Sequence, residues 1–250
     1  MIRQACLTQN LSLEVQEHKA LTQLTFQLPY SHCCGLTGRN GQGKSLLMAA
    51  LADELTPSIN VNVNGSIQWQ CAYAYLPQLQ RLTQNTIAQA LDIQELANAF
   101  TRIEQGHAPS ADYDLVEQQW HLPQQWQQTL EQALLPTALD YPVERLSEGQ
   151  KTRLALCRLF LLPDHYLLLD EPSNHLDQSS REWLIHAATH HPAGCLIISH
   201  DRILLDHMQH IFALDNLGLH FYGGNYTHYK EQHDLQTTAL ASSVGQQKKI

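Results

Sequence analysis

Residues 35–55 read GLTGRNGQGKSLLMAALADEL. Within it, residues 38–45 fit the pattern G-x-x-x-x-G-K-[ST]. In such a turn the backbone N–H groups and the positive end of the following helix wrap the β- and γ-phosphates, Lys44 adds charge, and the Ser45 hydroxyl can ligate Mg²⁺. The alternative is a chance glycine-rich turn, but an apolar strand pattern precedes the motif and helical spacing follows it. We therefore predict that residues 38–45, the phosphate loop, bind a nucleoside triphosphate.

A second motif, YLLLDEPSNHLD at residues 166–177, places two carboxylates at the end of an unbroken apolar run. Such a run is typical of a strand that is covered on both faces of a parallel sheet. At its end Asp170 can hold Mg²⁺ through water, and Glu171 can polarise an attacking water molecule. An acidic exit from strand to loop is the alternative if this motif stands alone. In combination with the phosphate loop, the pair indicates phosphoryl chemistry.

A third motif, LSEGQKTRLALCRLFLL at residues 146–162, opens an apolar helix. Ser147 and Gln150 stand in the S-x-x-Q relation of a capping box, in which each side chain bonds to the backbone of the other residue. Taken in isolation, a plain helix start is the better interpretation.

The order of the motifs changes that interpretation. The phosphate loop is followed by YLPQ with Gln78, then LSEGQ, LLLDEP and IISHD around His200. This series resembles the nucleotide-binding domain of the ATP-binding cassette (ABC) family over nearly the whole chain. EPSNHLD, SHDR and YGGNYTHY resemble the F subfamily, whose members join two cassettes in one chain without transmembrane segments. Many of them act on the ribosome as translation factors or antibiotic-resistance factors.

The resemblance implies a role for each matching residue. Lys44 and Glu171 become catalytic, with Glu171 as the base, and His200 senses the γ-phosphate. Ser45, Gln78 and Asp170 ligate Mg²⁺, and Asp177 links the two sites of a cassette pair. Ser147, Gly149 and Gln150 reach ATP that is held by a partner cassette. The phosphate-binding set is Gly38, Arg39, Asn40, Gly41, Gln42, Gly43, Lys44, Ser45 and Leu46.

Three residues depart from the family pattern. Val15 stands where family members usually offer an aromatic ring to adenine, so a stacking contact worth about 1 kcal/mol is missing. Leu46 occupies a position that is often threonine, which removes a possible hydroxyl contact to a phosphate. Glu148 replaces the first glycine of the usual signature pair, and a carboxylate near a triphosphate is unfavourable unless it points outward. Weak selectivity between nucleobases is therefore expected.

Composition limits the classes of protein and of partner. The chain has 250 residues, 43% of them hydrophobic, and a formal net charge of -9, so no overall basic field attracts nucleic acid or anionic lipid. Its apolar runs are far shorter than the roughly 20 residues of a membrane span, and its first residues make a poor secretory signal. We expect a cytoplasmic protein. The six cysteines lack C-x-x-C spacing and are expected to be reduced core thiols.

The predicted fold class is α/β, a P-loop NTPase core of ABC type with a mostly parallel sheet. An antiparallel β subdomain is expected from the alternating residues 59–63 and 67–75, which Asn64–Gly65 would join as a two-residue hairpin turn. A helical subdomain is expected at about residues 79–145. The cassette would span residues 1–230, and residues 231–250 would begin a linker helix between cassettes.

These observations lead to a functional hypothesis with two alternatives. The hypothesis is a conformational switch driven by Mg·ATP, in which ATP clamps two cassettes together and hydrolysis at Glu171 releases them, with the ribosome as target. The main alternative is the ATPase subunit of a membrane ABC transporter. The other is a binding module that no longer hydrolyses ATP, which the intact Lys44, Asp170, Glu171 and His200 disfavour.

Overall fold

The computed structural model describes residues 3–15, 18–55, 61–78, 82–174 and 176–235. The chain divides into two compact units. The first consists of Met1–Tyr75, Asp164–Glu171 and Ala188–Ile250, and the second of Leu76–Pro163 and Pro172–Ala187. No helix within the described ranges has both the length and the apolar character needed to cross a bilayer.

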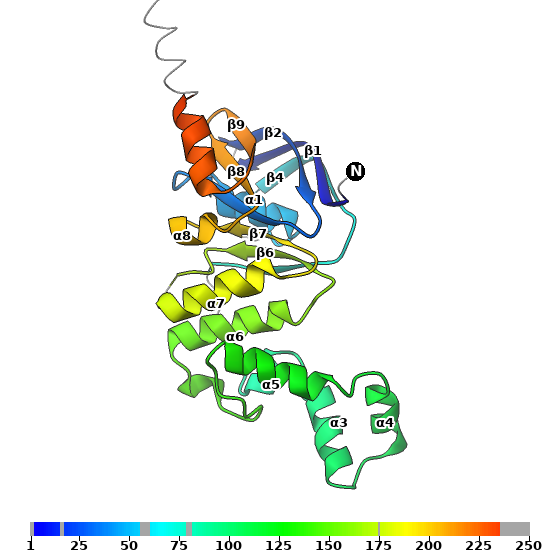
Figure 1. Ribbon diagram of the computed structural model, residues 1–250. Coiled ribbons are helices and arrows are strands. Elements are labelled where there is room, and N and C mark those ends of the chain that lie inside the picture. Colours follow the sequence, from blue (N-terminus) through cyan, green and yellow to red (C-terminus); the bar gives the residue numbers. More distant parts are fainter. Residues whose placement is uncertain (1–2, 16–17, 56–60, 79–81, 175, 236–250) are drawn as a thin grey trace, which may run out of the picture. The chain divides into compact units, whose positions relative to one another are not determined.

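The first unit carries a six-stranded sheet in the order β5-β6-β7-β3-β8-β9, of which Figure 1 labels β6, β7, β8 and β9. Its strands are β3 (Cys33–Gly38), β5 (Tyr73–Leu76), β6 (Tyr166–Asp170), β7 (Cys195–Ile198), β8 (His210–Asp215) and β9 (Gly218–Gly223). The pairs β6–β7, β7–β3 and β3–β8 are parallel, and β8–β9 is antiparallel. Every residue of β6 and β7 is buried, as their unbroken apolar sequences predicted.

A second, antiparallel sheet has the order β2-β1-β4. It consists of β1 (Gln4–Val15), β2 (His18–Pro29) and β4 (Val61–Trp69). Together with α1 (Lys44–Leu51), both sheets contribute to one apolar cluster that includes Leu11, Leu28, Leu47 and Phe212. The predicted α/β fold with a parallel and an antiparallel sheet is confirmed. Five of the six cysteines are buried, and all six are free thiols.

The predicted hairpin at Asn64–Gly65 is wrong. Both residues lie inside the continuous strand β4, which includes residues 67–69 of the second alternating stretch, while residues 73–75 of that stretch belong to β5 in the other sheet. Opposite Gly65, the β1–β4 register shifts between Gln9 and Ser12. Gly65 has φ +101°, and a Cβ there would lie 2.5 Å from the Asn10 carbonyl oxygen. The Asn-Gly pair thus lies opposite a bulge in β1, and the backbone of β1 approaches Gly65 too closely for a side chain.

The second unit is helical. It contains α2 (Ile87–Ala90), α3 (Gln94–Glu104), α4 (Ser110–Val116), α5 (Leu122–Gln132), the 3-10 turn η1 (Val143–Arg145), α6 (Glu148–Phe160) and most of α7 (Gln178–Thr189). One apolar cluster joins α2, α5 and α6, and another lies around Phe100 and Trp126, with α3 beside α4 (Figure 1). The expected helical range 79–145 falls inside this unit, which also takes in α6.

From Ala188 onward, before β7, the chain belongs to the first unit again. The short helix α8 (Arg202–Leu205) precedes β8, and residues 226–235 form a helix after β9. Of the predicted linker at residues 231–250, the part from residue 236 onward lies outside the described residues. The limits 1–230 of the cassette remain a prediction.

Candidate nucleotide-binding site

The phosphate loop joins β3 to α1, and close contacts on two sides fix its path. A Cβ at Gly38 would lie 2.4 Å from the carbonyl oxygen of Leu214 in β8. Gly43 has φ +91° and caps α1, and a Cβ there would meet Leu21 of β2 at 3.3 Å. Glycine is therefore required where the loop meets β8 and where it turns into the helix. The loop is held as a turn whose N–H groups lie at the positive end of α1.

The side chains of Lys44 and Gln42 form hydrogen bonds with backbone groups of the same loop. Lys44 is 7% exposed, and its ammonium group donates to the carbonyl oxygens of Gly38 at 2.9 Å and Arg39 at 3.0 Å. The Arg39 N–H donates to Gln42 Oε1 at 2.6 Å. Burial lowers the pKa of Lys44, while the nearby Glu171 and Asp170 carboxylates oppose this shift. An anion that enters the loop meets a cation already positioned there.

Asp170 ends β6 next to the loop and is 2% exposed. Burial raises the pKa of its carboxyl group, while a hydrogen bond with Ser45 and the charge of Lys44 lower that pKa. Among the described residues, its buried Oδ1 has no hydrogen-bond partner. A buried carboxylate oxygen beside a hydroxyl is the kind of donor set that a hard cation such as Mg²⁺ prefers. The residues present therefore fit the predicted metal.

Glu171 and His200 lie together, as a catalytic base and a phosphate sensor would. The His200 Nε2 atom is 3.4 Å from Glu171 Oε1. Burial raises the pKa of Glu171, and His200 partly offsets this shift. Glu171 also has φ +50°, unusual for a residue other than glycine, while its N–H donates to the Ile198 carbonyl oxygen at 2.9 Å. A strained backbone held by β7 is typical of a functional position.

A cavity of about 710 Å³ adjoins the phosphate loop. Arg39, Asn40 and His200 line it, and so do Tyr226 and Lys230 of the helix at residues 226–235. The sequence motifs did not predict this contribution of the helix. Its signal was the YGGNYTHY segment, in which a Gly-Gly-Asn break precedes aromatic residues at i and i+3 spacing, Tyr226 and Tyr229.

A second cavity of about 390 Å³ lies on the β2 side of the loop. Leu21, Thr22 and Gly41 line one side of it, and Asn216 and Leu217 the other. Val15, the position expected to face the base, is not among the residues that line this cavity. The described β2 residues that line it are Ala20, Leu21, Thr22 and Leu24, and none of these four carries an aromatic ring.

The remaining predicted residues lie in the second unit. Ser147 and Gln150 form the predicted capping box at the start of α6: the Ser147 N–H donates to Gln150 Oε1 at 2.9 Å, and the Gln150 N–H donates to Ser147 Oγ at 3.3 Å. Gly149 lies in this first turn. Glu148 is largely exposed and pairs with Lys151 at 2.8 Å, so its carboxylate points outward. The predicted phosphate-facing residues of the signature are thus gathered at one helix start.

Asp177 and Gln78 also belong to the second unit. Asp177 precedes α7, where its carboxylate accepts from the Ser180 N–H at 2.9 Å and the Ser179 hydroxyl at 3.1 Å. These bonds lower the pKa of Asp177 to about 2, so it is ionised at neutral pH. Gln78 is exposed in the turn after β5. Their roles in metal binding and in linking two sites remain predictions.

Fold and site together are those of an ATP-binding cassette, the nucleotide-binding unit of a class of ATPases. A family model described as ABC transporter matches residues 21–174, so the chain belongs to the ABC transporter family. The resemblance drawn from the ordered motifs, including its F-subfamily branch, is confirmed.

Curated relatives share the chain's sequence over most of its length. The energy-dependent translational throttle protein EttA of Haemophilus influenzae is 33% identical over 221 residues, which cover 79% of this chain and 39% of that protein. EttA of Escherichia coli K12 is 32% identical, with 86% of this chain and 42% of that protein covered. The chain therefore spans about two fifths of the length of the curated relatives it matches.

Solved structures share the fold. An ATP-binding subunit of an ABC transporter superposes with a TM-score of 0.68 at 19% identity, covering 92% of this chain and 94% of that one. A bacterial Atm1-family ABC exporter with ATP bound also gives 0.68, at 18% identity, covering 97% of this chain and 42% of that one. At these identities the likeness concerns the fold alone.

Proposed function

We propose that this cassette binds and hydrolyses Mg·ATP and acts as a conformational switch in a cytoplasmic translation factor that works on the ribosome. The observation that carries the hydrolytic part is the pair of carboxylates beside the phosphate loop, of which Asp170 is buried and Glu171 is half-buried and in contact with His200. The translational part rests on the likeness to proteins named translational throttle. No observation favours antibiotic resistance among the possible roles.

In this proposal the chain's own groups divide the work. Lys44 and the loop N–H groups hold the phosphates, and Ser45, Asp170 and Gln78 hold Mg²⁺, which neutralises charge on the β- and γ-phosphates. Glu171 orients water and accepts its proton, and a raised pKa strengthens it as an acceptor near neutral pH. His200, beside Glu171, contacts the γ-phosphate. Ser147, Gly149 and Gln150 complete the site of a partner cassette.

The hydrolytic role is tested by Glu171→Gln. Binding of Mg·ATP should stay within about twofold of the unmodified chain, because the phosphate loop is intact, while turnover falls by on the order of 10²-fold or more. Glu54→Gln is the matched control, since Glu54 is exposed in the same unit. Calorimetry measures the first quantity and phosphate release the second. Turnover near the normal rate in Glu171→Gln would remove this residue from the role.

The ribosomal role is separated from the transporter alternative by co-sedimentation. Glu171→Gln with Mg·ATP holds the bound state, so it should sediment with purified ribosomes more than the same protein with ADP, because a switch differs in affinity between its two states. Membrane vesicles that carry transporter subunits provide the competing target. Nucleotide-dependent recovery with those vesicles and not with ribosomes favours the ATPase subunit of a transporter.

A further inference from the structure

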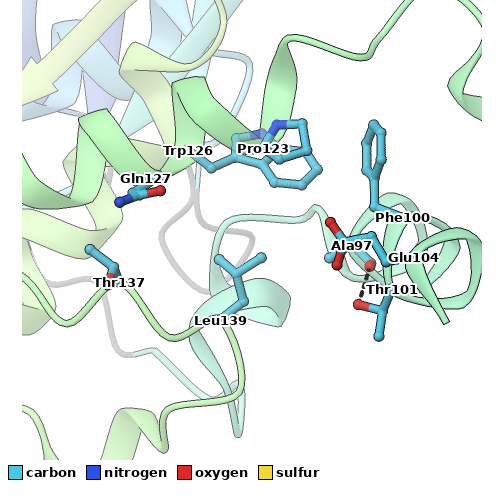
Figure 2. A pocket seen from close by; sticks show the side chains of 9 residues that line it. All are labelled: Ala97, Phe100, Thr101, Glu104, Pro123, Trp126, Gln127, Thr137 and Leu139. Carbon is cyan, nitrogen blue, oxygen red and sulfur yellow. Dashed lines mark hydrogen bonds between the residues drawn. The ribbon is translucent and has the colours of Figure 1, made fainter.

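A cavity of about 320 Å³ lies in the second unit and has no part in the nucleotide chemistry described above. Figure 2 shows side chains of α3 on one side of it, and Pro123, Trp126 and Gln127 of α5 with Leu139 around the rest. Thr101 donates to the Ala97 carbonyl oxygen at 2.9 Å, so its hydroxyl is engaged within α3. Its lining is mixed: five residues are apolar or aromatic, and four, Thr101, Glu104, Gln127 and Thr137, are polar or charged.

Two aromatic rings on its wall are held rigidly. Trp126 is 3% exposed and Phe100 is 7% exposed, and both belong to the apolar cluster that includes Ala99 and Val116. Their ring centroids are 5.9 Å apart with planes at 78°, an edge-to-face contact. Trp120, 56% exposed, also packs on Phe100, with centroids 5.8 Å apart. Phe100 and Trp126 therefore offer the small exposed parts of their rings to the cavity in a fixed arrangement, and Trp120 extends the aromatic group to the surface.

Glu104 supplies one carboxylate at this cavity, at the end of α3. Within the described part of the chain, no hydrogen bond or ion pair engages it. Asp112, by contrast, is held by two bonds of 2.7 Å from Arg102. A carboxylate left unpaired beside two aromatic rings attracts a cation on two grounds, by its charge and by the negative faces of the rings.

The surrounding charge has the same sign. We define the acidic lobe as residues 92–140, which contain α3, α4 and α5 and include eight acidic side chains against a single basic one, Arg102. Asp112 already pairs with Arg102. Nucleic acid, a polyanion, is repelled by such a lobe, whereas a basic protein segment is attracted to it.

We propose that the acidic lobe docks a basic protein segment and takes one of its arginine side chains into this cavity. The planar guanidinium stacks on aromatic rings and forms paired hydrogen bonds with a carboxylate, which an ammonium group does less well. Exposed Trp120 and Tyr113 then contact apolar residues that flank the arginine. This inference goes beyond the proposed function, because it names the kind of protein segment that binds to a surface with no role in hydrolysis.

The experiment uses the whole chain and two short peptides. Acetyl-Leu-Arg-Leu-amide should bind saturably in calorimetry and change tryptophan fluorescence. The isosteric peptide with citrulline in place of arginine lacks the charge and should bind at least about tenfold more weakly. Glu104→Gln should weaken binding of the arginine peptide by about tenfold, as expected for loss of one charge-assisted bond to a carboxylate. Glu117→Gln, the same change in the acidic lobe but outside the cavity, should stay within about twofold.

A second variant tests the aromatic rings. Phe100→Leu keeps an apolar side chain at the position, and a melting curve shows whether the lobe stays folded; binding of the arginine peptide should fall several-fold. The proposal is overturned by the absence of saturable binding, by equal binding of the citrulline peptide or of acetyl-Leu-Glu-Leu-amide, or by equal losses in Glu104→Gln and Glu117→Gln. These measurements need no ATP, so their failure is distinguishable from failure of the proposed hydrolytic function.

Discussion

At the scale of single residues, the positions of the two carboxylates at the end of β6 are explained by ligand binding better than by the stability of the fold. Asp170 is buried with one oxygen that lacks a hydrogen-bond partner in the described structure, and Glu171 has an unfavourable backbone conformation. Both groups have a raised pKa because burial disfavours their charged forms. Such positions cost stability in the absence of a ligand and are kept for what they bind.

We therefore predict that Asp170→Asn stabilises the nucleotide-free chain. A carboxyl whose pKa is raised on folding imposes a cost that is absent below its unfolded pKa and complete above its folded pKa. Removing the charge should raise Tm by a few degrees at pH 7.5, and the gain should shrink to nothing as pH falls below about 4. The measurement is calorimetric unfolding at several pH values.

The matched control for that measurement is Asp53→Asn, because Asp53 is exposed in the same unit. Its Tm should change little at any pH. A lower Tm for Asp170→Asn at neutral pH would mean that the favourable contacts of the carboxylate with Ser45 and Lys44 outweigh its burial. Mg·ATP binding to Asp170→Asn should meanwhile be weaker, since a ligand oxygen has lost its charge.

At the scale of elements, α6 was predicted well because its start is decided by neighbours in sequence. Ser147 and Gln150 cap each other across three residues, so the local pattern contains the whole interaction. The buried strands β6 and β7 were predicted equally well, since burial on both faces of a parallel sheet requires apolar residues throughout. The phosphate loop, β6 and α6 were thus placed correctly from sequence.

Elements whose geometry depends on distant backbone were misread or missed. Asn64–Gly65 has the composition of a hairpin turn, but its conformation is set by the close approach of β1, some fifty residues earlier in the chain. The helix at residues 226–235 was noted only for its motif, because nothing local reveals that Tyr226 and Lys230 line a cavity with Arg39. Pairing between remote segments is not encoded in local spacing.

The bulge in β1 opposite Gly65 gives a prediction for Gly65→Ala. A Cβ would lie 2.5 Å from the Asn10 carbonyl oxygen and 2.6 Å from that of Gln9, at a φ of +101°. Unfolding free energy should fall by about 2–3 kcal/mol, as expected for strain combined with displaced backbone. Urea unfolding, followed by fluorescence of Trp69 in the same strand, measures it.

Gly223→Ala serves as the control for Gly65→Ala. Gly223 ends β9 in the same unit, and a Cβ there would meet no heavy atom within 4 Å. Its unfolding free energy should change by less than about 0.5 kcal/mol. Similar losses in the two variants would show that the effect at position 65 does not come from contact with β1, since the effect of Gly→Ala on the unfolded chain is stabilising.

At the scale of the whole molecule, the chain holds one phosphate loop and one signature, and the family resemblance assigns these to different nucleotides. We predict that ATP hydrolysis requires two cassettes, because the positioning that speeds reaction is incomplete in one. For the chain alone, the hydrolysis rate should rise with the square of protein concentration at low occupancy. Ser147→Arg should abolish hydrolysis while leaving ATP binding at the phosphate loop.

Complementation sharpens this prediction. Ser147→Arg copies retain Lys44, and Lys44→Ala copies retain Ser147, so a mixture can assemble one intact site from two inactive proteins. Activity should return in the mixture and in neither protein alone. Brisk hydrolysis by a monomer, linear in concentration and indifferent to Ser147→Arg, contradicts a shared site.

The capping box at α6 has a further consequence for such a shared site. The Ser147 hydroxyl and the Gln150 amide each satisfy a backbone N–H at the start of the helix, so those donors are occupied before any anion arrives. A phosphate that reaches them takes the place of an internal acceptor, and association becomes an exchange of one hydrogen-bond acceptor for another. The net gain per contact is then small, about 0.5–1.5 kcal/mol, so a small change in the phosphate, such as loss of its terminal group, suffices to reverse it. Because the start of α6 is already capped without a partner, it can release the phosphate at little cost, as a protein that repeatedly binds and releases its partner requires.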